Sequence, residues 1–274
     1  MKGLEFTIIR NAYIWNDKSW NVSMHTVAGR SNPEPKGVFV RSIILSFLVK
    51  HPDVGYFLFD TGLSPIDAQT RNGYQKEYFP LEVADDLYID KQLNKMGIGV
   101  DDISCVIMSH LHWDHLDGIE LFSGTKAIKN VYTQKAELQA GLMYTHGAGP
   151  KDPGDPIYCK RVLDNEEIEY KFVDGDTELF PGVHLFTMTG HTPGALAMML
   201  ELESGNYIFP GDAVFTHENF TIPPVPAGLV LDTLGFTESV EKLYKIQQKT
   251  NATMIYSHDP VEYENYKHAP EWYK

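Results

Sequence analysis

The chain has 274 residues, of which 43% are hydrophobic, and its 23 Lys and Arg against 37 Asp and Glu give a formal net charge of −14. An acidic surface repels phosphates at long range, so neither nucleic acids nor anionic membranes are expected as partners. The longest strongly apolar stretch, 42–49, is too short to span a bilayer, and the N-terminus lacks the core of a signal peptide. We therefore expect one cytoplasmic globular domain over residues 1–274.

Short apolar runs rich in β-branched and aromatic residues predict strands over 5–15, 38–49, 56–59, 103–108, 183–188, 195–203, 207–209 and 253–256. Helical periodicity predicts helices over 82–95, 134–142 and 237–248. Strands interleaved with helices indicate an α/β layered fold. Two stretches with many Gly or Pro residues, 144–156 and 216–235, are predicted as long loops that form lids or pocket walls, with surface decoration as the alternative.

The stretch HLHWDH at residues 110–115 places three imidazoles and a carboxylate within six residues. Chance would produce this HxHxDH pattern on the order of 10⁻³ times in a chain of this length. Imidazoles so close together repel one another when protonated, whereas neutral imidazoles are good ligands for a metal cation. Because one zinc ion takes about four ligands, the stretch would half-fill two sites.

Further metal-capable side chains follow the later predicted strands. His191 comes after strand 183–188, Asp212 after strand 207–209 and His258 after strand 253–256. The HLHWDH stretch likewise follows strand 103–108. Loops at strand ends can converge on one rim of a sheet, which is where α/β folds usually place their sites. These positions together predict a metal centre.

The order of HxHxDH, a Gly-His, a Gly-Asp and a late His, preceded by FDTG at 59–62, resembles the metallo-β-lactamase superfamily. Within that superfamily it is similar to the N-acyl homoserine lactonases. The resemblance covers nearly the whole chain and implies a four-layer αβ/βα sandwich with two zinc ions, a site that iron, manganese or cobalt could also occupy. It implies these ligands: His110, His112 and His191 on one metal, Asp114, His115 and His258 on the other, and Asp212 between them. Asp60 would orient a ligand histidine, with a simple turn residue as the alternative.

The resemblance also implies a reaction, the opening of a lactone ring by a hydroxide that bridges the two metals. Asp114 and Asp212 are then the catalytic carboxylates, and Asp114 would pass a proton to the departing alkoxide. The expected substrates are N-acyl homoserine lactones, and another small lactone, an ester or a thioester remains an alternative. A metal-dependent oxidoreductase is less favoured because diiron relatives have Glu at the position of His112. A non-catalytic binding module is disfavoured by the complete ligand set, and a homodimer remains open.

One position departs from the lactonase pattern. Those enzymes usually carry a tyrosine three residues after the bridging aspartate, where this chain has Phe215, so a hydroxyl for the substrate carbonyl is missing. The candidate replacement donors are Tyr144, His146 and His217. The apolar side chains expected to line a groove for an acyl chain, with ordinary core packing as the alternative for each, are Tyr74, Tyr78, Phe79, Phe215 and Phe220.

Overall fold

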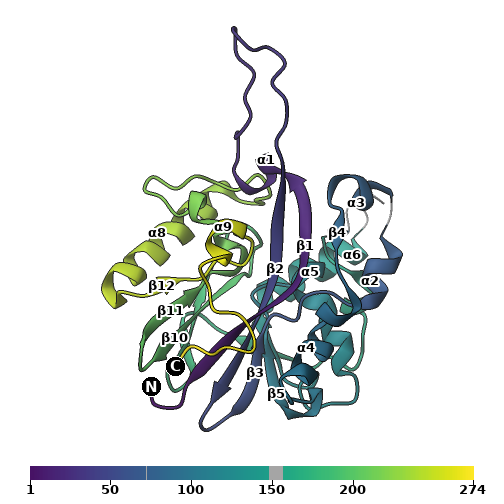
Figure 1. Cartoon of the computed structure of the whole chain (residues 1–274), viewed down its shortest axis with the longest axis vertical. Helices are drawn as coiled ribbons and strands as arrows, with labels where there is room; N and C mark the ends of the chain where they lie inside the picture. The colour runs from purple at the N-terminus through teal and green to yellow at the C-terminus, as the bar shows by residue number, and fades with distance from the viewer. Residues whose placement is uncertain (72, 148–156) are drawn as a thin grey trace.

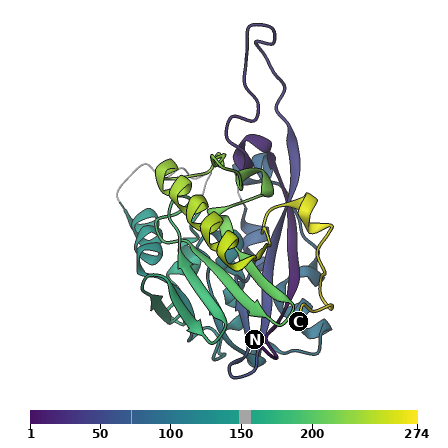
Figure 2. The same ribbon diagram turned by 90° about the vertical axis from the view of Figure 1, so that its left-hand side faces the viewer.

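Two β-sheets lie face to face, and helices cover the outer face of each sheet (Figures 1 and 2). The structure is a computed structural model that describes residues 1–71, 73–147 and 157–274. The layer order is helix, sheet, sheet, helix, so the predicted four-layer αβ/βα sandwich is confirmed. Among the described residues, no helix combines the length and apolar character needed to cross a membrane.

The first sheet has seven strands in the order β4-β1-β2-β3-β5-β6-β7, and the second has five in the order β12-β11-β10-β9-β8. Neighbours are antiparallel from β4 to β3 and parallel from β3 to β7, and in the second sheet only β11 and β12 are parallel. The strands are β1 (Glu5–Asp17), β2 (Phe39–His51), β3 (Gly55–Phe59), β4 (Leu81–Glu82), β5 (Ile103–Ile107), β6 (Val131–Gln134), β7 (Tyr170–Val173), β8 (Thr177–Phe180), β9 (Val183–Thr187), β10 (Leu196–Leu202), β11 (Gly205–Phe209) and β12 (Thr253–Met254).

Most helices are short and follow strands on the outer faces of the two sheets. The α-helices are α1 (Lys18–Asn21), α2 (Pro65–Thr70), α3 (Gly73–Tyr78), α4 (Ile89–Lys95), α5 (Trp113–Leu116), α6 (Lys135–His146), α7 (Lys160–Leu163), α8 (Thr233–Thr250) and α9 (Pro260–Tyr263). The 3₁₀-helices are η1 (Asp85–Leu87), η2 (Val100–Asp102), η3 (Asp117–Phe122), η4 (Gly211–Ala213) and η5 (His217–Asn219).

A cluster of buried aromatic rings joins the two sheets. Phe6 of β1 and Phe47 of β2 both contact Phe209 of β11, with ring centroids 4.9 and 4.6 Å apart. Phe59 of β3 completes the cluster, and all four rings are buried. Full burial of such side chains contributes about 1.5–3 kcal/mol each, so this cluster contributes to holding the two sheets together.

The longest helix, α8, covers the outer face of the five-stranded sheet (Figure 2). Phe236, Val240 and Leu243 recur at helical spacing and are buried against that sheet. The helix begins where the Asp232 carboxylate accepts a hydrogen bond from the Leu234 N–H, and it ends at the left-handed residue Asn251. The predicted helix over 237–248 is therefore confirmed, with several further residues at its N-terminal end and two at its C-terminal end.

Two predicted segments differ from the structure. The predicted helix over 82–95 is divided into β4, η1 and α4, because Tyr88 has the extended ψ of 145° that ends one helical turn before the next begins. The predicted helix over 134–142 continues to His146, so the predicted loop over 144–156 starts at 147. Residues 148–156 of that loop lie outside the described residues. Strands β4, β6, β7 and β8, each of four residues or fewer, were not predicted.

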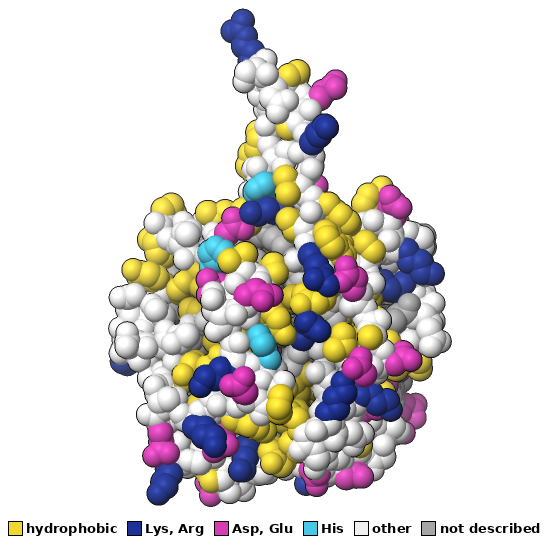
Figure 3. Space-filling model, in the orientation of Figure 1, with side chains coloured by type: hydrophobic (Ala, Val, Ile, Leu, Met, Phe, Trp, Pro, Cys, Tyr) yellow, Lys and Arg dark blue, Asp and Glu magenta, His cyan; other side chains and the backbone are white. Residues whose placement is uncertain are grey.

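An arm formed by residues 22–38 projects away from the sandwich between α1 and β2 (Figure 1). Gly29 and Asn32 close a turn within this arm through two backbone hydrogen bonds. Basic side chains are prominent at its tip (Figure 3). At the base of the arm, α1 contributes Trp20 and Asn21 to the cavity described below.

Candidate metal centre

The seven predicted metal ligands all follow strands and lie together at one end of the sandwich. The HLHWDH stretch follows β5, and its last three residues lie in the single turn of α5. His191 follows β9, Asp212 lies in η4 after β11, and His258 follows β12. Loops of the first sheet therefore carry the four predicted ligands between 110 and 115, and loops of the second sheet carry His191, Asp212 and His258.

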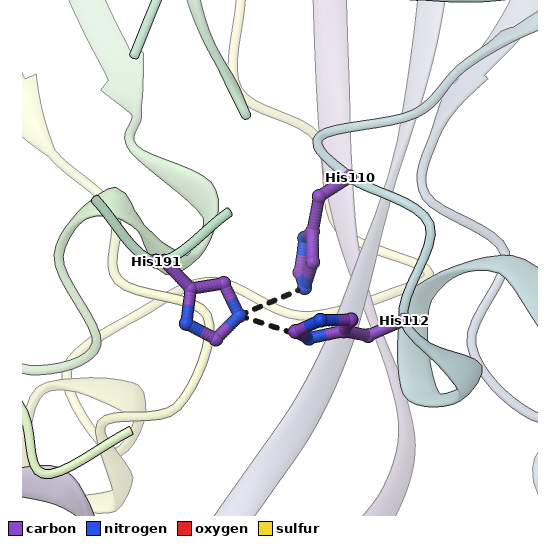
Figure 4. Close-up of side chains that lie close together, drawn as sticks. All are labelled: His110, His112 and His191. Carbon is purple, nitrogen blue, oxygen red and sulfur yellow. Dashed lines mark hydrogen bonds between the residues drawn. The ribbon is translucent and has the colours of Figure 1, made fainter. Parts of the chain in front are cut away.

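Three imidazoles meet in the first half of the site (Figure 4). The Nε2 atom of His191 lies 3.2 Å from Nε2 of His110 and 3.0 Å from Nδ1 of His112. All three rings are buried. Oδ2 of Asp212 approaches the same point, at 3.4 Å from His191 Nε2 and 3.8 Å from His110 Nε2.

The second half of the site lies on the other side of Asp212. The Nε2 atoms of His115 and His258 are 3.3 Å apart, and Oδ2 of Asp114 is 3.6 Å from the first and 3.9 Å from the second. Oδ1 of Asp212 lies 3.4 Å from His115 Nε2 and 3.0 Å from His258 Nε2. The two oxygens of one carboxylate thus face the two halves separately, which is the geometry of a bridging ligand.

Backbone carbonyls fix which nitrogen carries the proton in two of these rings. Nδ1 of His191 donates to the Leu229 carbonyl at 3.0 Å, and Nδ1 of His258 donates to the Ile43 carbonyl at 2.6 Å. A carbonyl can only accept, so in the neutral ring the proton lies on Nδ1 and Nε2 presents a lone pair.

Asp60 and Ser109 fix the other two rings. Asp60 Oδ2 accepts from Nδ1 of His115 at 2.8 Å and from the Ser109 hydroxyl at 2.7 Å. Because Ser109 has donated its only hydroxyl hydrogen, its oxygen accepts from Nδ1 of His110 at 3.0 Å. Asp60 therefore orients the ring of His115 directly and that of His110 through Ser109, whose part in the site the sequence did not reveal.

These contacts show that the residues fit a metal centre. In their neutral forms with the proton on Nδ1, His110 and His191 direct lone pairs at each other across 3.2 Å, and so do His115 and His258 across 3.3 Å. Two lone pairs at that distance repel each other, so neutral rings need a shared cation between them. A mixed set of imidazoles and carboxylates is the donor set that zinc and neighbouring divalent metals bind.

The charges of the site are strongly coupled. Burial and the neighbouring imidazoles hold the pKa of His110 and of His112 well below the usual value, so both rings are neutral. Burial also disfavours charge on His115 and His258, but the nearby carboxylates, Asp212 foremost, outweigh it and raise the pKa of both rings. The imidazoles in turn hold the pKa of Asp212 well below its usual value despite burial. Positive charge is therefore favoured in the second half of the site, where a bound cation would supply it.

A buried carboxylate that sequence reasoning missed connects two ligand loops. Glu137, in the first turn of α6, accepts from the Leu111 N–H at 3.0 Å and from the Gly194 N–H at 3.2 Å. The Tyr158 hydroxyl donates to it at 3.1 Å. Burial raises the pKa of Glu137, and these hydrogen bonds oppose the rise. The only sequence signal was an acidic residue near the start of a predicted helix, which is common at helix N-termini.

A cavity opens directly onto this centre, and His112, Asp114, His191, Asp212 and His258 form part of its wall. The apolar side chains that line it are Ile14, Trp20, Phe79, Trp113, Ile157, Phe215 and Leu229. The remaining polar lining comes from Asn16, Asn21, Ser42, Arg71 and Gln75. A largely apolar cavity with a few placed polar groups is typical of a small-molecule site.

Two of the predicted pocket residues, Phe79 and Phe215, line this cavity, whereas six others lie outside its lining. Tyr74 and Tyr78 pack against each other in α3 with tilted rings, whose centroids are 4.6 Å apart. Phe220 packs on rings of α8 and of the segment after β12.

The three candidate replacement donors also make other contacts. His146 lies on the exposed side of α6 beside Lys160, and Tyr144 contacts the ring of Tyr158. His217 forms a hydrogen bond of 2.5 Å with Asp259.

A two-sheet αβ/βα sandwich with a buried cluster of imidazoles and carboxylates at one end of its sheets defines a metal-binding protein. The sequence model of the metallo-beta-lactamase superfamily matches residues 40–258. The chain belongs to that superfamily.

Relatives and solved structures agree with this assignment. The chain is 28% identical to an N-acyl homoserine lactonase of Bacillus thuringiensis over 225 residues, 80% of this chain and 82% of that protein. It is 27% identical to the N-acyl homoserine lactonase AttM of Rhizobium radiobacter, over 83% of this chain and 86% of that protein. Its fold matches a variant of B. thuringiensis AiiA with N-decanoyl-L-homoserine bound at the active site, with a TM-score of 0.83, 25% identity and full coverage of both chains. Since these relatives are hydrolases, the chain is classed as a hydrolytic enzyme.

Proposed function

We propose that the protein opens the ring of N-acyl homoserine lactones with two divalent metal ions, zinc being the expected metal. The observation that carries this proposal is the position of the Nε2 atoms of His191 and His258 on the two sides of the Asp212 carboxylate. In both rings Nδ1 donates its hydrogen to a backbone carbonyl, so that Nε2 is the nitrogen available to a metal ion. The similarity to named lactonases over four fifths of the chain supports the choice of substrate.

The seven side chains would divide as the resemblance implies. His110, His112 and His191 hold one ion, Asp114, His115 and His258 hold the other, and Asp212 bridges them. Ions bound there supply an activated water molecule and polarise the substrate carbonyl.

Asp114 is placed to move a proton within the cavity. Its carboxylate is the least buried among the ligands, with 14% of the side chain exposed, and it lines the cavity. It accepts a proton as water attacks and returns it to the ring oxygen as the alkoxide departs, which makes Asp114 a catalytic residue. Asp212, fixed between four imidazoles, keeps its charge through the reaction.

The apolar wall gives the cavity a preference for substrates with a hydrocarbon chain. Phe79, Trp113 and Phe215 present ring surface beside the polar floor. Each methylene of an acyl chain that leaves water for such a surface contributes about 0.8 kcal/mol to binding.

Metal analysis of the purified protein and a pH-stat assay with N-hexanoyl and N-decanoyl homoserine lactone test this proposal together. We expect about two metal ions per chain, by the ligand count that each site needs, and acid release with both lactones. The variant His191→Ala should lose metal and acid release. His184→Ala, which changes a partly exposed histidine of β9 paired with Glu201, should keep both.

The same assay distinguishes the alternatives. The protein could bind two metals and release no acid from any lactone, yet hydrolyse a phenyl ester or a thioester. That result would change the proposed substrate and keep the proposed metal chemistry. Full activity in metal-free protein would overturn the proposal.

A further inference from the structure

Three polar side chains joined by hydrogen bonds line part of the cavity. Asn16 is near the end of β1, Asn21 ends α1, and Ser42 lies on β2. Ser42 is the cross-strand partner of Ile14, and Ile14 and Asn16 share one face of β1 because side chains alternate along a strand. We call these three residues, Asn16, Asn21 and Ser42, the amide patch, for the reason that follows.

Hydrogen bonds within the patch run in one direction. The side-chain amide of Asn16 donates one hydrogen to the Asp17 carbonyl at 3.0 Å and the other to Oδ1 of Asn21 at 2.7 Å. The side-chain amide of Asn21 then donates to Oγ of Ser42 at 2.8 Å. Asn16 and Ser42 are buried, with 4% and 2% of their surfaces exposed, so their geometry is well constrained.

This direction leaves two hydrogen-bonding positions for a ligand. Ser42 already accepts through Oγ, and its hydroxyl hydrogen has no acceptor within the described part of the chain. Asn16 has used both amide hydrogens, and its Oδ1 accepts from no described residue. The wall therefore offers one donor and one acceptor, which is the complement of a secondary amide with its C=O and N–H.

The patch also lies next to the metal centre. Ser42 directly precedes Ile43, whose carbonyl accepts from His258, and both Ser42 and His258 line the same cavity. In an N-acyl homoserine lactone the amide is attached to the ring carbon beside the reacting carbonyl. A group that binds the amide would therefore be expected close to the metal ligands.

We propose that the amide patch recognises the acyl amide of the substrate, with the Ser42 hydroxyl donating to the amide carbonyl and Asn16 Oδ1 accepting from the amide N–H. Asn21 is a positioning residue that holds Ser42 with its hydrogen directed at the ligand. The patch makes the enzyme selective for lactones that carry an N-acyl group over lactones with a plain alkyl chain. This inference rests on the proposed lactone hydrolysis.

The test compares two substrates of matched length, N-hexanoyl homoserine lactone and α-heptyl-γ-butyrolactone, which has a chain on the same ring carbon but no amide. For Ser42→Ala we expect kcat/KM to fall about tenfold with the amide substrate, mainly through KM, because one buried hydrogen bond is lost. With the alkyl lactone the same variant should stay within about twofold of the wild type. Ser42→Thr, which keeps the hydroxyl, should restore most of the discrimination.

Ser46→Ala is the matched control. Ser46 lies on the same strand and accepts from the side-chain amide of Asn11 at 2.7 Å, but it does not line the cavity. Ser46→Ala removes a buried Asn–Ser hydrogen bond away from the cavity and so affects stability alone. The ratio of kcat/KM for the amide substrate to kcat/KM for the alkyl lactone should therefore not change.

The outcomes separate the two proposals. If metal-loaded wild type hydrolyses neither lactone, the proposed function is wrong, and the amide patch falls with it. If wild type hydrolyses both and Ser42→Ala, folded and with its full metal content, slows both equally or neither, the amide patch is overturned while the lactonase proposal stands.

Discussion

Phe215 sits where the resemblance to lactonases leads one to expect a hydroxyl. Its ring lies between two of the proposed ligands, with centroids 5.1 Å from His191 and 5.5 Å from His258. It lines the cavity, so in the proposed reaction a para hydroxyl on this ring would be a candidate donor to the substrate carbonyl. None of the candidate replacement donors, His146, Tyr144 and His217, lines that cavity.

We therefore expect Phe215→Tyr to raise kcat for N-acyl homoserine lactones. A preorganised donor to a developing oxyanion typically contributes about 10²–10³ in rate, and an introduced hydroxyl should recover about tenfold of it. The measurement is the pH-stat rate at saturating substrate, with metal content matched between the two proteins. An unchanged or lower kcat would mean that another group already supplies this hydrogen bond.

Glu137 acts at the same scale on the ligand loops. One carboxylate accepts from the loop of His110 and His112 and from the loop of His191, and no other residue type of that size accepts from both N–H groups. In Glu137→Gln one of the two N–H groups would face an NH₂ group and lose its acceptor.

For Glu137→Gln we expect the free energy of unfolding of the metal-free protein to fall by about 2–3 kcal/mol, since a buried donor loses a charged partner. We also expect weaker metal retention, because both loops carry ligands. Urea unfolding and titration with a metal-binding dye measure the two effects. Tyr158→Phe removes only one donor to the same carboxylate and should cost less than half as much; equal costs would contradict the bridging role.

At the residue scale the sequence identified site residues that stand close together in the chain or follow a strand, and it missed residues whose role depends on tertiary contacts. Four proposed ligands stand within six residues, and the others each follow a strand, so their pattern was visible. Glu137, Ser109 and Ser42 carry no such pattern, because a lone glutamate or serine acquires its role only when distant loops close around it. Of the five apolar pocket candidates, Phe79 and Phe215 line the cavity and three do not, because the sequence does not distinguish an aromatic side chain that lines a pocket from one that packs on neighbouring rings.

At the scale of the element, contacts with helices hold in place the loops that carry the proposed ligands. Gly190 precedes His191, has a φ of +119°, and its carbonyl accepts from the N–H groups of Leu231 and Asp232. A Cβ atom at this position would collide with the backbone of Phe236 in the first turn of α8. The loop that carries His191 is therefore fixed to α8 by a close backbone approach.

Gly190→Ala should accordingly lower the free energy of unfolding by about 2 kcal/mol or more, from strained φ and displaced backbone combined. It should also reduce metal binding, because His191 moves with the loop. Thermal unfolding with and without added metal measures both. Gly29→Ala in the arm, where a Cβ meets nothing within 4 Å, is the control and should stay within about 0.5 kcal/mol. A Gly190→Ala protein as stable as this control would show that the loop is not fixed by α8.

Elements with strong periodicity or long apolar runs were predicted well, and those set by tertiary contacts were not. Each predicted strand has a counterpart in the structure, and the apolar face of α8 is evident in the sequence. The end of α6 was misjudged because residues 143–146 carry no periodic apolar signal, although Thr145 donates back to the Gly141 carbonyl within a continuing helix. That error placed Tyr144 and His146 on a loop, and so made them appear free to reach the substrate.

For the whole molecule, the site joins the two halves of the sandwich. The HLHWDH stretch extends from β5 of the seven-stranded sheet, whereas His191, Asp212 and His258 extend from β9, β11 and β12 of the five-stranded sheet. Each proposed metal position draws ligands from both sheets. Bound ions would therefore act as cross-links between sheets that otherwise depend on apolar packing across their interface.

Removal of the metals should lower the stability of the entire fold rather than loosen one loop. A ligand present at a thousand times its dissociation constant stabilises the native state by about 4 kcal/mol per site. Since about 1 kcal/mol shifts Tm by roughly 2–4 °C in a domain near this size, chelation should lower Tm by about 10 °C or more. Calorimetric scans before and after chelation measure this, and re-addition of zinc should restore the original Tm. Hydrogen exchange should then increase in β10 and β11 as well as near the ligands; an increase confined to the ligand loops would contradict a cross-linking role.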